Sequence, residues 1–311
     1  MTRVAAVDLG TNSTRLLVAD VLDGRVDELV RETVITRLGE GVDERRRLLP
    51  VPIARVRNCL TDFRHRAEEL GAERTLAVAT SAIRDAENGE AFLGEVEWSY
   101  GFDTRLLSGE EEAAMTLGGV SVGRRLEPGT LLLDVGGGST ELTVGDFRVS
   151  LDVGSVRLTE RLLASDPPSK DELAACRAAI RSVLEERAGD LDVRHAIGVA
   201  GTITTIAALE LGEYDRDRVH GYRIPTGRVE EQLERLASLP LAERREVPGL
   251  EPERAPVIVA GIAIVAETLR FFGLAELEVS EHDLLTGAAL AAAELPERQE
   301  GDAPPGAYTC C

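Results

Sequence analysis

The chain carries one pattern of apolar and polar positions that predicts a strand, a tight turn and a second strand. Between Leu131 and Gly145, an apolar run stops at Asp134 and meets three consecutive glycines. Beyond the glycines, Leu142 and Val144 alternate with polar residues, which is the period of a strand with one buried face. The stretch is therefore expected to form a hairpin whose turn consists largely of glycine.

The same hairpin pattern occurs at the start of the chain. Residues 8–20 align without gaps on residues 134–146, and seven of the thirteen positions are identical. Typical residue frequencies would give about one identity by chance. Arg15 stands where the second copy has Glu141, so the two copies differ in charge. This internal repeat predicts two similar lobes, each beginning with the hairpin.

Apolar periodicity in the remainder of the chain predicts alternating helices and strands. Helical spacing covers residues 52–70, and short buried strands are expected over residues 75–80 and 196–200. Further helices are expected over residues 170–187 and about 283–294. The fold class is accordingly α/β, with two lobes that each contain a mixed sheet and flanking helices.

The lobe boundary is expected at a charged segment with glycine and proline near residues 123–129. The first lobe then covers residues 1–125 and the second lobe covers residues 126–282. Residues 295–311 are polar and rich in proline and glycine, so they are expected to be disordered.

Composition and charge exclude several classes of protein. The net charge of −20 argues against binding to nucleic acid or to an anionic membrane. Lys170 is the only lysine and lies outside any Gly-x-x-x-x-Gly-Lys-Ser/Thr sequence, which excludes a P-loop NTPase. The four cysteines lack the spacing of a disulfide framework or a zinc site.

The sequence shows no sign of export or of membrane insertion. Residues 1–7 run almost directly into the first strand and leave no room for a signal peptide. The longest apolar run, residues 256–266, is too short to span a bilayer, and a buried helix is expected there. A cytoplasmic location fits these features and the cysteine content best.

The glycine turn suggests anion binding. Gly136, Gly137 and Gly138 place no Cβ in the turn, so successive amides can surround an anion, most plausibly a phosphate. Asp134 and Glu141 flank the turn as two oxygen donors that suit a hard cation such as Mg²⁺. A glycine triplet alone is equally compatible with a structural hairpin, and the repeat is what favours function.

Three further motifs hold candidate residues. Arg84 follows a predicted strand at the end where ligands of α/β sheets usually bind, and its fork suits two phosphate oxygens, although a surface salt bridge is the alternative. Three glutamates, residues 110–112, begin a helix, where acidic residues also simply favour the dipole. Thr202 lies at the start of another helix, whose amides suit either an anion or an ordinary turn. The pair His282-Asp283 lacks the additional ligands that an HD-type metal site needs.

Five ordered blocks give the chain a resemblance to a known family. Besides the two hairpins, these blocks are Ala79–Asn88, Leu107–Ala113 and Gly198–Thr205. Over nearly its whole length the chain resembles the exopolyphosphatase / guanosine pentaphosphate phosphohydrolase (Ppx/GppA) family, within the actin-like phosphotransferase superfamily. The resemblance implies two actin-like (ribonuclease H-like) lobes with a cleft between them, and a C-terminal helix that packs back on the first lobe.

The resemblance implies an enzyme that releases orthophosphate from the end of inorganic polyphosphate with the help of Mg²⁺. A guanosine pentaphosphate phosphohydrolase, an actin-like sugar kinase or ATPase, and a non-catalytic regulator that binds polyphosphate or nucleotide are the alternatives. The preferred chain length and the oligomeric state stay open, with a homodimer as one arrangement.

Residue roles follow from the residues together with the resemblance. In this hypothesis both turns bind the terminal phosphate, and Arg84 neutralises its oxygens. Asp134 and Glu141 hold Mg²⁺, with Asp8 as a third carboxylate. The resemblance places the general base on the glutamate immediately before an alanine, which is Glu112. The other phosphate-binding candidates are Asn12, Ser13, Arg15, Gly136, Gly137, Gly138, Ser139 and Thr202.

Overall fold

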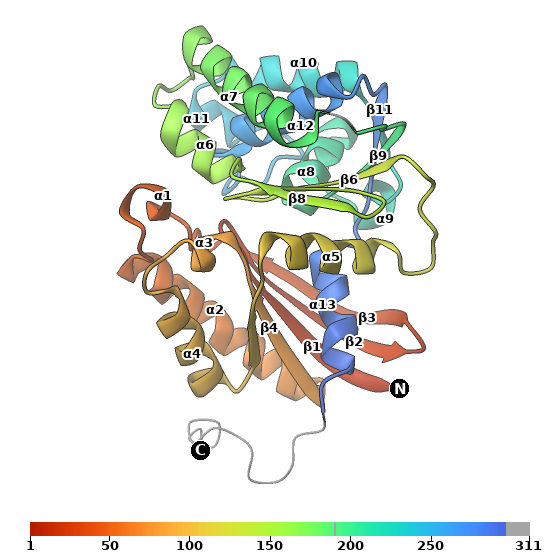
Figure 1. Ribbon diagram of the computed structural model, residues 1–311. Coiled ribbons are helices and arrows are strands. Elements are labelled where there is room, and N and C mark those ends of the chain that lie inside the picture. The colour runs from red at the N-terminus through yellow and green to blue at the C-terminus, as the bar shows by residue number, and fades with distance from the viewer. Residues whose placement is uncertain (190, 297–311) are drawn as a thin grey trace. The chain divides into compact units, whose positions relative to one another are not determined.

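The computed structural model describes residues 1–189 and 191–296 (Figure 1). Two compact units make up the chain. One comprises Met1–Arg125 and the residues from His282 onward, and the other comprises Leu126–Glu281. The first unit is thus completed by the last helix of the chain. Most of the tail that is expected to be disordered, with Cys310 and Cys311, lies outside the described residues.

The first unit consists of one mixed sheet and the helices that cover it. Its strands are β1 (Thr2–Leu9), β2 (Thr14–Leu22), β3 (Arg25–Val34), β4 (Arg74–Ala79) and β5 (Asp103–Leu106). Its helices are α1 (Val42–Arg45), α2 (Pro50–Glu69), α3 (Ser81–Arg84), α4 (Gly89–Tyr100), α5 (Gly109–Val120) and α13 (Leu284–Ala293). The strand order is β3-β2-β1-β4-β5, with an antiparallel meander over β1, β2 and β3, while β4 and β5 run parallel to β1.

The second unit repeats this plan and adds to it. Its strands are β6 (Thr130–Val135), β7 (Thr140–Val144), β8 (Phe147–Leu151), β9 (His195–Val199), β10 (Arg223–Pro225) and β11 (Glu276–Val279). Its helices are α6 (Ser155–Leu162), α7 (Lys170–Ala188), α8 (Ala200–Leu211), α9 (Arg216–Val219), α10 (Thr226–Ala237), α11 (Leu241–Arg244) and α12 (Ile258–Phe271). The strand order is β10-β11-β9-β6-β7-β8. Again an antiparallel meander, β6 to β8, is followed by strands parallel to its first member, β9 and β11.

The two meanders share their register as well as their topology. Asp8 lies opposite Arg15 in the first hairpin, and Asp134 lies opposite Glu141 in the second. Each turn is closed by the same hydrogen bond, which is 3.0 Å long from Gly10 N to Ser13 O in one and from Gly136 N to Ser139 O in the other. The predicted α/β fold, with mixed sheets and flanking helices, is confirmed.

Both faces of the first sheet are buried. On β1, Ala5 and Val7 belong to a core cluster with residues of α2 and α4, whereas Val4 and Ala6 belong to a cluster with residues of α13. Because successive side chains of a strand point to opposite faces, the middle of β1, from Val4 to Val7, is continuously apolar instead of alternating. Figure 1 shows α13 against the strands of this sheet.

The apolar run over residues 256–266 lies largely in α12, in the core of the second unit. Every residue from Ile258 to Leu269 is buried there, so the prediction of a buried helix is confirmed. Within the described part of the chain, no helix has the length and apolar character needed to cross a membrane.

Two glycines allow α13 to approach α5 closely. A Cβ added to Gly119 would lie 2.0 Å from the carbonyl oxygen of Asp283, and one added to Gly287 would lie 2.0 Å from that of Met115. Both obstructing atoms belong to the backbone, so neither can move aside without displacing a helix. The backbones of α5 and α13 are therefore in direct contact at these positions.

We expect Gly119→Ala to lower the free energy of unfolding by about 3 kcal/mol, because the new methyl group overpacks a backbone contact. The neighbouring glycine provides a matched control, since a Cβ on Gly118 would meet no atom within 4 Å. Gly118→Ala should be neutral or raise the stability by up to about 1 kcal/mol through helix propensity. Urea titrations of the two variants test this, and equal midpoints would contradict it.

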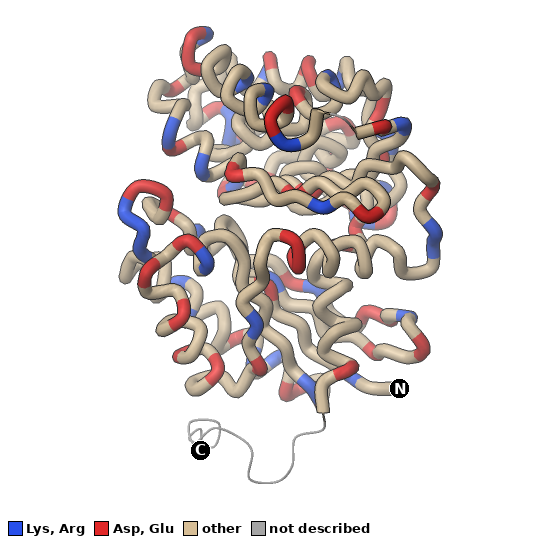
Figure 2. The backbone as a smooth tube through the Cα atoms, in the orientation of Figure 1, with Lys and Arg blue, Asp and Glu red and all other residues tan. Residues whose placement is uncertain are grey.

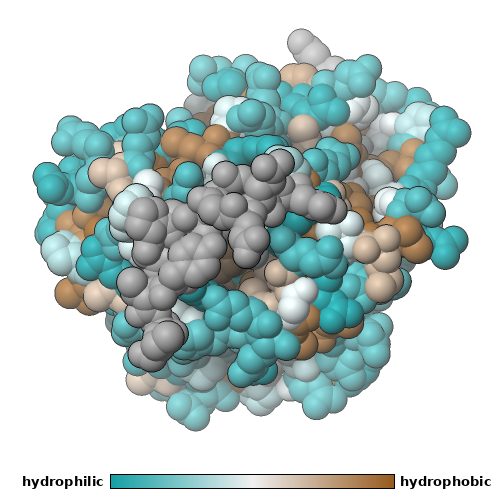
Figure 3. Space-filling model, turned by 90° about the horizontal axis from the view of Figure 1, so that it is seen from below, coloured by the Kyte–Doolittle hydropathy of each residue, from teal (hydrophilic) through white to brown (hydrophobic). Residues whose placement is uncertain are grey.

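Charged residues are spread over both units. Figure 2 shows acidic and basic positions interleaved along the backbone instead of gathered in one block. On the face seen in Figure 3, hydrophilic side chains cover most of the described surface, with smaller apolar areas between them. With a net charge of −20, an anionic ligand would have to be bound by particular cations and amides rather than by a generally basic surface.

Candidate functional site

The glycine turn between β6 and β7 directs its carbonyl groups towards the start of α6. The amide of Ser155 donates to the carbonyl oxygen of Gly136 over 3.0 Å, and that of Val156 donates to Gly137 over 2.8 Å. The approach is close, since a Cβ on Gly154 would lie 2.4 Å from the Gly137 oxygen. The first helical turn of α6 therefore packs against the carbonyl side of the glycine turn.

Three amide groups of the same turn make no backbone hydrogen bond within the described residues. Among the described residues, no backbone hydrogen bond has the amide of Gly137, Gly138 or Ser139 as its donor. Consecutive amides without a backbone acceptor are the groups that form anion-binding concavities in tight turns. The geometry thus suits an anion on the side of the turn that faces away from α6.

Asp134 and Glu141 lie next to this turn as opposed residues of β6 and β7. Both are buried, with 7% and 2% exposure. Opposed residues of an antiparallel pair project to the same face of the sheet, so the two carboxylates share one side. The hydroxyl of Ser150 on β8 donates to Glu141 Oε1 over 2.7 Å and holds that carboxylate from the neighbouring strand.

This donor set fits a hard divalent cation that is only partly held by protein. Among residues 1–189 and 191–296, no group of three or more His, Cys, Asp or Glu side chains could hold a metal ion. Mg²⁺ commonly takes one or two carboxylates and completes its octahedron with water and phosphate oxygens. Asp134 and Glu141 supply such a pair of oxygen donors on one face of the sheet.

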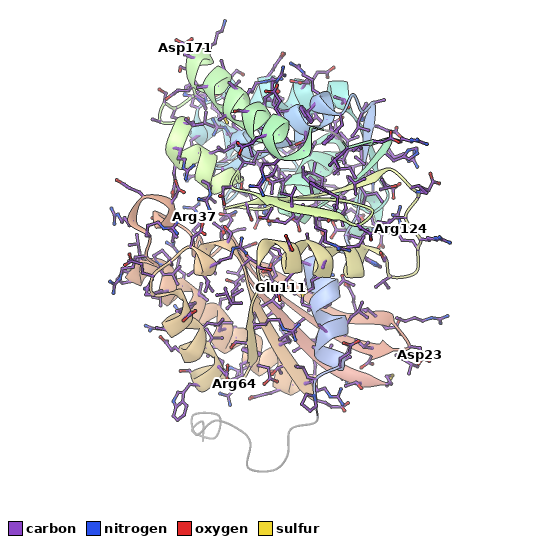
Figure 4. The ribbon with its side chains drawn as sticks, viewed as in Figure 1. Asp23, Arg37, Arg64, Glu111, Arg124 and Asp171 are labelled. Carbon is purple, nitrogen blue, oxygen red and sulfur yellow. The ribbon has the colours of Figure 1, made fainter. Side chains whose placement is uncertain are left out.

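The turn between β1 and β2 has the same construction with a different support. The carbonyl oxygen of Thr11 accepts from the amide of Gly39 over 2.8 Å, and that of Asn12 accepts from Arg37 over 2.9 Å. The Oδ1 atom of Asn12 is buried and has no hydrogen-bond partner among the described residues. Figure 4 labels Arg37, which follows β3. Both turns thus have carbonyls bound to a neighbouring segment.

Arg15 and Asp8, which were expected to face phosphate and metal, lie in a buried ion-pair network. Arg15 binds Asp8 Oδ2 through Nη2 over 2.7 Å, and it also binds Asp283 through Nη1. Arg31 binds the other oxygen of Asp283 over 3.3 Å. Burial raises the pKa of Asp8 while Arg15 opposes this, and the second oxygen of Asp8, Oδ1, is buried without a partner among the described residues.

Asp283 joins this network from the last helix of the chain. Its carboxylate caps α13 by accepting from the amide of Leu285 over 3.0 Å. Burial alone would raise the pKa of Asp283, but Arg15 and Arg31 outweigh it and lower the pKa to about 2. The carboxylate of the His282-Asp283 pair is therefore paired with arginines and serves as a helix cap.

Arg84 and Glu112, which lie far apart in the sequence, are brought together in the first unit. Nη1 of Arg84 lies 3.2 Å from Glu112 Oε2 and 2.8 Å from the carbonyl oxygen of Leu107. The Nε and Nη2 atoms of Arg84 donate no hydrogen bond within the described residues. One edge of the guanidinium fork thus anchors Glu112, and the other edge is available for a pair of oxygens.

The start of α5 distinguishes the three consecutive glutamates. Glu111 completes a capping box with Ser108, and the hydrogen bond from the Ser108 amide lowers its pKa. Glu110 is exposed, and Figure 4 labels Glu111 on this helix. Only Glu112 is buried, at 6% exposure. The geometry therefore separates one enclosed carboxylate from two that serve the helix end or the solvent.

Comparison with known proteins identifies the family. A model described as the Ppx/GppA phosphatase family matches residues 17–292. The chain belongs to the Ppx/GppA phosphatase family. Exopolyphosphatase 2 of Mycobacterium tuberculosis is 39% identical over 317 residues, which cover 94% of this chain and 99% of that protein.

Two other similar proteins bear on the activity of this Ppx/GppA phosphatase. The crystal structure of an exopolyphosphatase-like protein has a TM-score of 0.86 at 33% identity and covers 93% of this chain and 98% of its own. A guanosine-5'-triphosphate,3'-diphosphate pyrophosphatase of Aeromonas salmonicida is 30% identical over 269 residues, which cover 84% of this chain and 53% of that protein.

Sequence reasoning missed one arginine of this Ppx/GppA phosphatase. Arg254 packs on the start of α8, where a Cβ on Gly201 would lie 2.1 Å from its Nη1. Ala200, the first residue of α8, has a φ of 69°, a strained conformation of the kind that gathers at functional sites. Thr202 is buried beside them. Nothing in the sequence around residue 254 signals this contact, which depends on the tertiary fold.

Proposed function

We propose that this protein is an exopolyphosphatase that releases orthophosphate from the end of inorganic polyphosphate. The observation that carries the proposal is the turn over residues 136–139. Within the described residues, the amides of Gly137, Gly138 and Ser139 have no backbone acceptor, and the turn lies beside two buried carboxylates. The similarity to exopolyphosphatase 2 over nearly the whole of both chains supports it.

In this proposal the second unit binds the terminal phosphate. The amides of Gly137, Gly138 and Ser139 donate to its non-bridging oxygens, and the Ser139 hydroxyl assists them. Asp134 and Glu141 are the residues that would hold Mg²⁺. When bound, this cation would supply charge stabilisation for the phosphoryl group, which is the main requirement of phosphoryl transfer.

The first unit supplies the groups that act on water and on charge. A water oxygen attacks the terminal phosphorus, Glu112 accepts a proton from that water, and the bond from phosphorus to the bridging oxygen breaks to leave a polyphosphate shorter by one phosphate. The open edge of the Arg84 fork neutralises charge on the transferred group. Asn12 and Ser13 contribute donors from the first turn.

The contacts of Asp8 and Arg15 lead us to revise their proposed roles. In the first unit Arg15 stands opposite Asp8 and neutralises it, where the second unit has Glu141 opposite Asp134. We therefore assign Mg²⁺ to Asp134 and Glu141, and Arg15 to the orientation of Asp8. The partnerless Oδ1 of Asp8 can then accept a hydrogen bond from a water at the site.

Guanosine pentaphosphate is the second candidate substrate. The relative from Aeromonas salmonicida is named for a guanosine substrate, and hydrolysis of a terminal phosphate uses the same residues on a different leaving group. A non-catalytic regulator that binds polyphosphate would use the same turns without needing Glu112.

One experiment separates these candidates. Orthophosphate release is measured with polyphosphate of defined lengths, guanosine pentaphosphate and ATP, each with and without Mg²⁺. We expect Mg²⁺-dependent release from polyphosphate. Faster release from guanosine pentaphosphate would reverse the order of the two substrates, ATP turnover would indicate a kinase or ATPase, and tight binding without release would indicate a regulator.

A further inference from the structure

The carbonyl groups of all three glycines in the second turn are bound by the first turn of α6. Backbone amides account for two of them, since Ser155 donates to Gly136, and both Val156 and Arg157 donate to Gly137. The next amide of the helix, that of Leu158, already donates to Gly154 within α6. No amide of α6 is thus left for the third carbonyl, that of Gly138.

The side chain of Arg157 takes the place of the missing amide. Its Nε atom donates to the carbonyl oxygen of Gly138 over 2.6 Å, and the residue is buried, with 6% exposure. A hydrogen bond from a charged donor is stronger than one from a neutral amide. The guanidinium therefore fixes the peptide group between Gly138 and Ser139.

The orientation of that peptide group decides where the next amide points. In a planar trans peptide the C=O and N–H bonds point in opposite directions. Each carbonyl drawn towards α6 therefore turns the following amide away from α6, which concerns the amides of Gly137, Gly138 and Ser139. The orientation of the Ser139 amide depends on Arg157, because the backbone dihedral angles of Gly138 allow the Gly138–Ser139 peptide group several orientations.

The corresponding carbonyls of the first turn are bound by backbone amides. These carbonyls belong to Thr11 and Asn12, and the amides are those of Gly39 and Arg37. In the second turn, the third carbonyl is bound by the buried side chain of Arg157.

We propose that Arg157 is a positioning residue for the phosphate cradle. It holds the Gly138–Ser139 peptide so that the Ser139 amide faces the bound phosphate, and it touches neither substrate nor product. This inference rests on the proposed function, because it assumes that the amides of the turn bind the terminal phosphate and the orthophosphate that is formed.

Orthophosphate provides the test, since as product it occupies the cradle without the rest of the polymer. In Arg157→Gln we expect the inhibition constant of orthophosphate to rise about tenfold or more, as for the loss of one well-oriented hydrogen bond to a charged group. The value of kcat/KM for polyphosphate should fall by a similar factor. Arg157→Lys should be intermediate, because it keeps the charge and one donor.

Arg177→Gln is the control for the loss of a partly buried arginine that is bound to carboxylates. Arg177 lies on α7 and binds Glu230 and Glu267, away from the turn. We expect it to lower the melting temperature while the inhibition constant of orthophosphate stays at the wild-type value. A wild-type constant in Arg157→Gln, or an equal rise in Arg177→Gln, would overturn the proposal.

Failure of this inference can be distinguished from failure of the proposed function. If the wild-type protein hydrolyses no polyphosphate, calorimetric titration of wild type and variants with orthophosphate still measures the cradle. If Arg157→Gln does not fold, the orthophosphate affinity of Arg157→Lys becomes the test of the proposal. An affinity equal to that of the wild type in Arg157→Lys would contradict a positioning role.

Discussion

Glu112→Gln is expected to lower kcat for polyphosphate hydrolysis by about 10²–10⁴-fold, the usual value of a positioned general base. The amide keeps nearly the shape of the carboxylate but cannot accept the proton from the attacking water. Glu112 is the enclosed glutamate at the start of α5, anchored by Arg84 at 3.2 Å. The measurement is kcat under saturating polyphosphate, together with the inhibition constant of orthophosphate, which should change little.

Glu111→Gln is the control for this variant. Glutamine can occupy the same place in a capping box, so the helix end should survive and kcat should stay near the wild-type value. Full activity in Glu112→Gln with loss of activity in Glu111→Gln would shift the assignment of the base by one residue. Activity in both variants would place the base elsewhere.

Asp134→Asn is expected to reduce kcat/KM by on the order of 10²-fold or more at low Mg²⁺. A bound cation stabilises the charge that develops in the transition state by several kcal/mol. Loss of one of two adjacent carboxylates weakens the site for a hard cation, so the Mg²⁺ concentration needed for half-maximal activity should rise. Glu141→Gln should give the same phenotype, since the two residues are opposed across β6 and β7.

The control for the metal site is Asp152→Asn, which removes an exposed carboxylate just after β8 in the same unit. Its Mg²⁺ dependence should match that of the wild type. Titrations with Mg²⁺ at fixed polyphosphate check the comparison. An unchanged half-maximal concentration in Asp134→Asn would remove Asp134 from the set of cation ligands.

The fold could be predicted from the sequence because its signals are local. The apolar run of β6, the period of two in β7 and the apolar spacing in α2 each depend on neighbours within one element. The repeat at a constant offset predicted the same hairpin in both lobes, and in the structure Gly10 and Gly136 close the two turns with the same hydrogen bond. The short elements β10 and α11 carry too few residues for such a signal.

The candidate site depends more heavily on tertiary contacts. The sequence pointed to Arg84 and Glu112 separately, through motif position and family resemblance. Their contact, and the burial that sets Glu112 apart from Glu110 and Glu111, arise from the packing of α3 and α5 in the first unit. The pattern of three acidic residues alone is also that of an ordinary helix N-terminus.

By itself the sequence determined the two glycine-containing turns, the carboxylates beside them and the arginine in the short segment after β4, since each is a property of consecutive residues. Only the tertiary structure decided the partners of the buried charges. Arg15 is paired with Asp283 from the last helix, and Arg157 is bound to Gly138. Such pairings follow from the need to satisfy a buried charge wherever the fold provides a partner, and separation along the chain carries no signal for them.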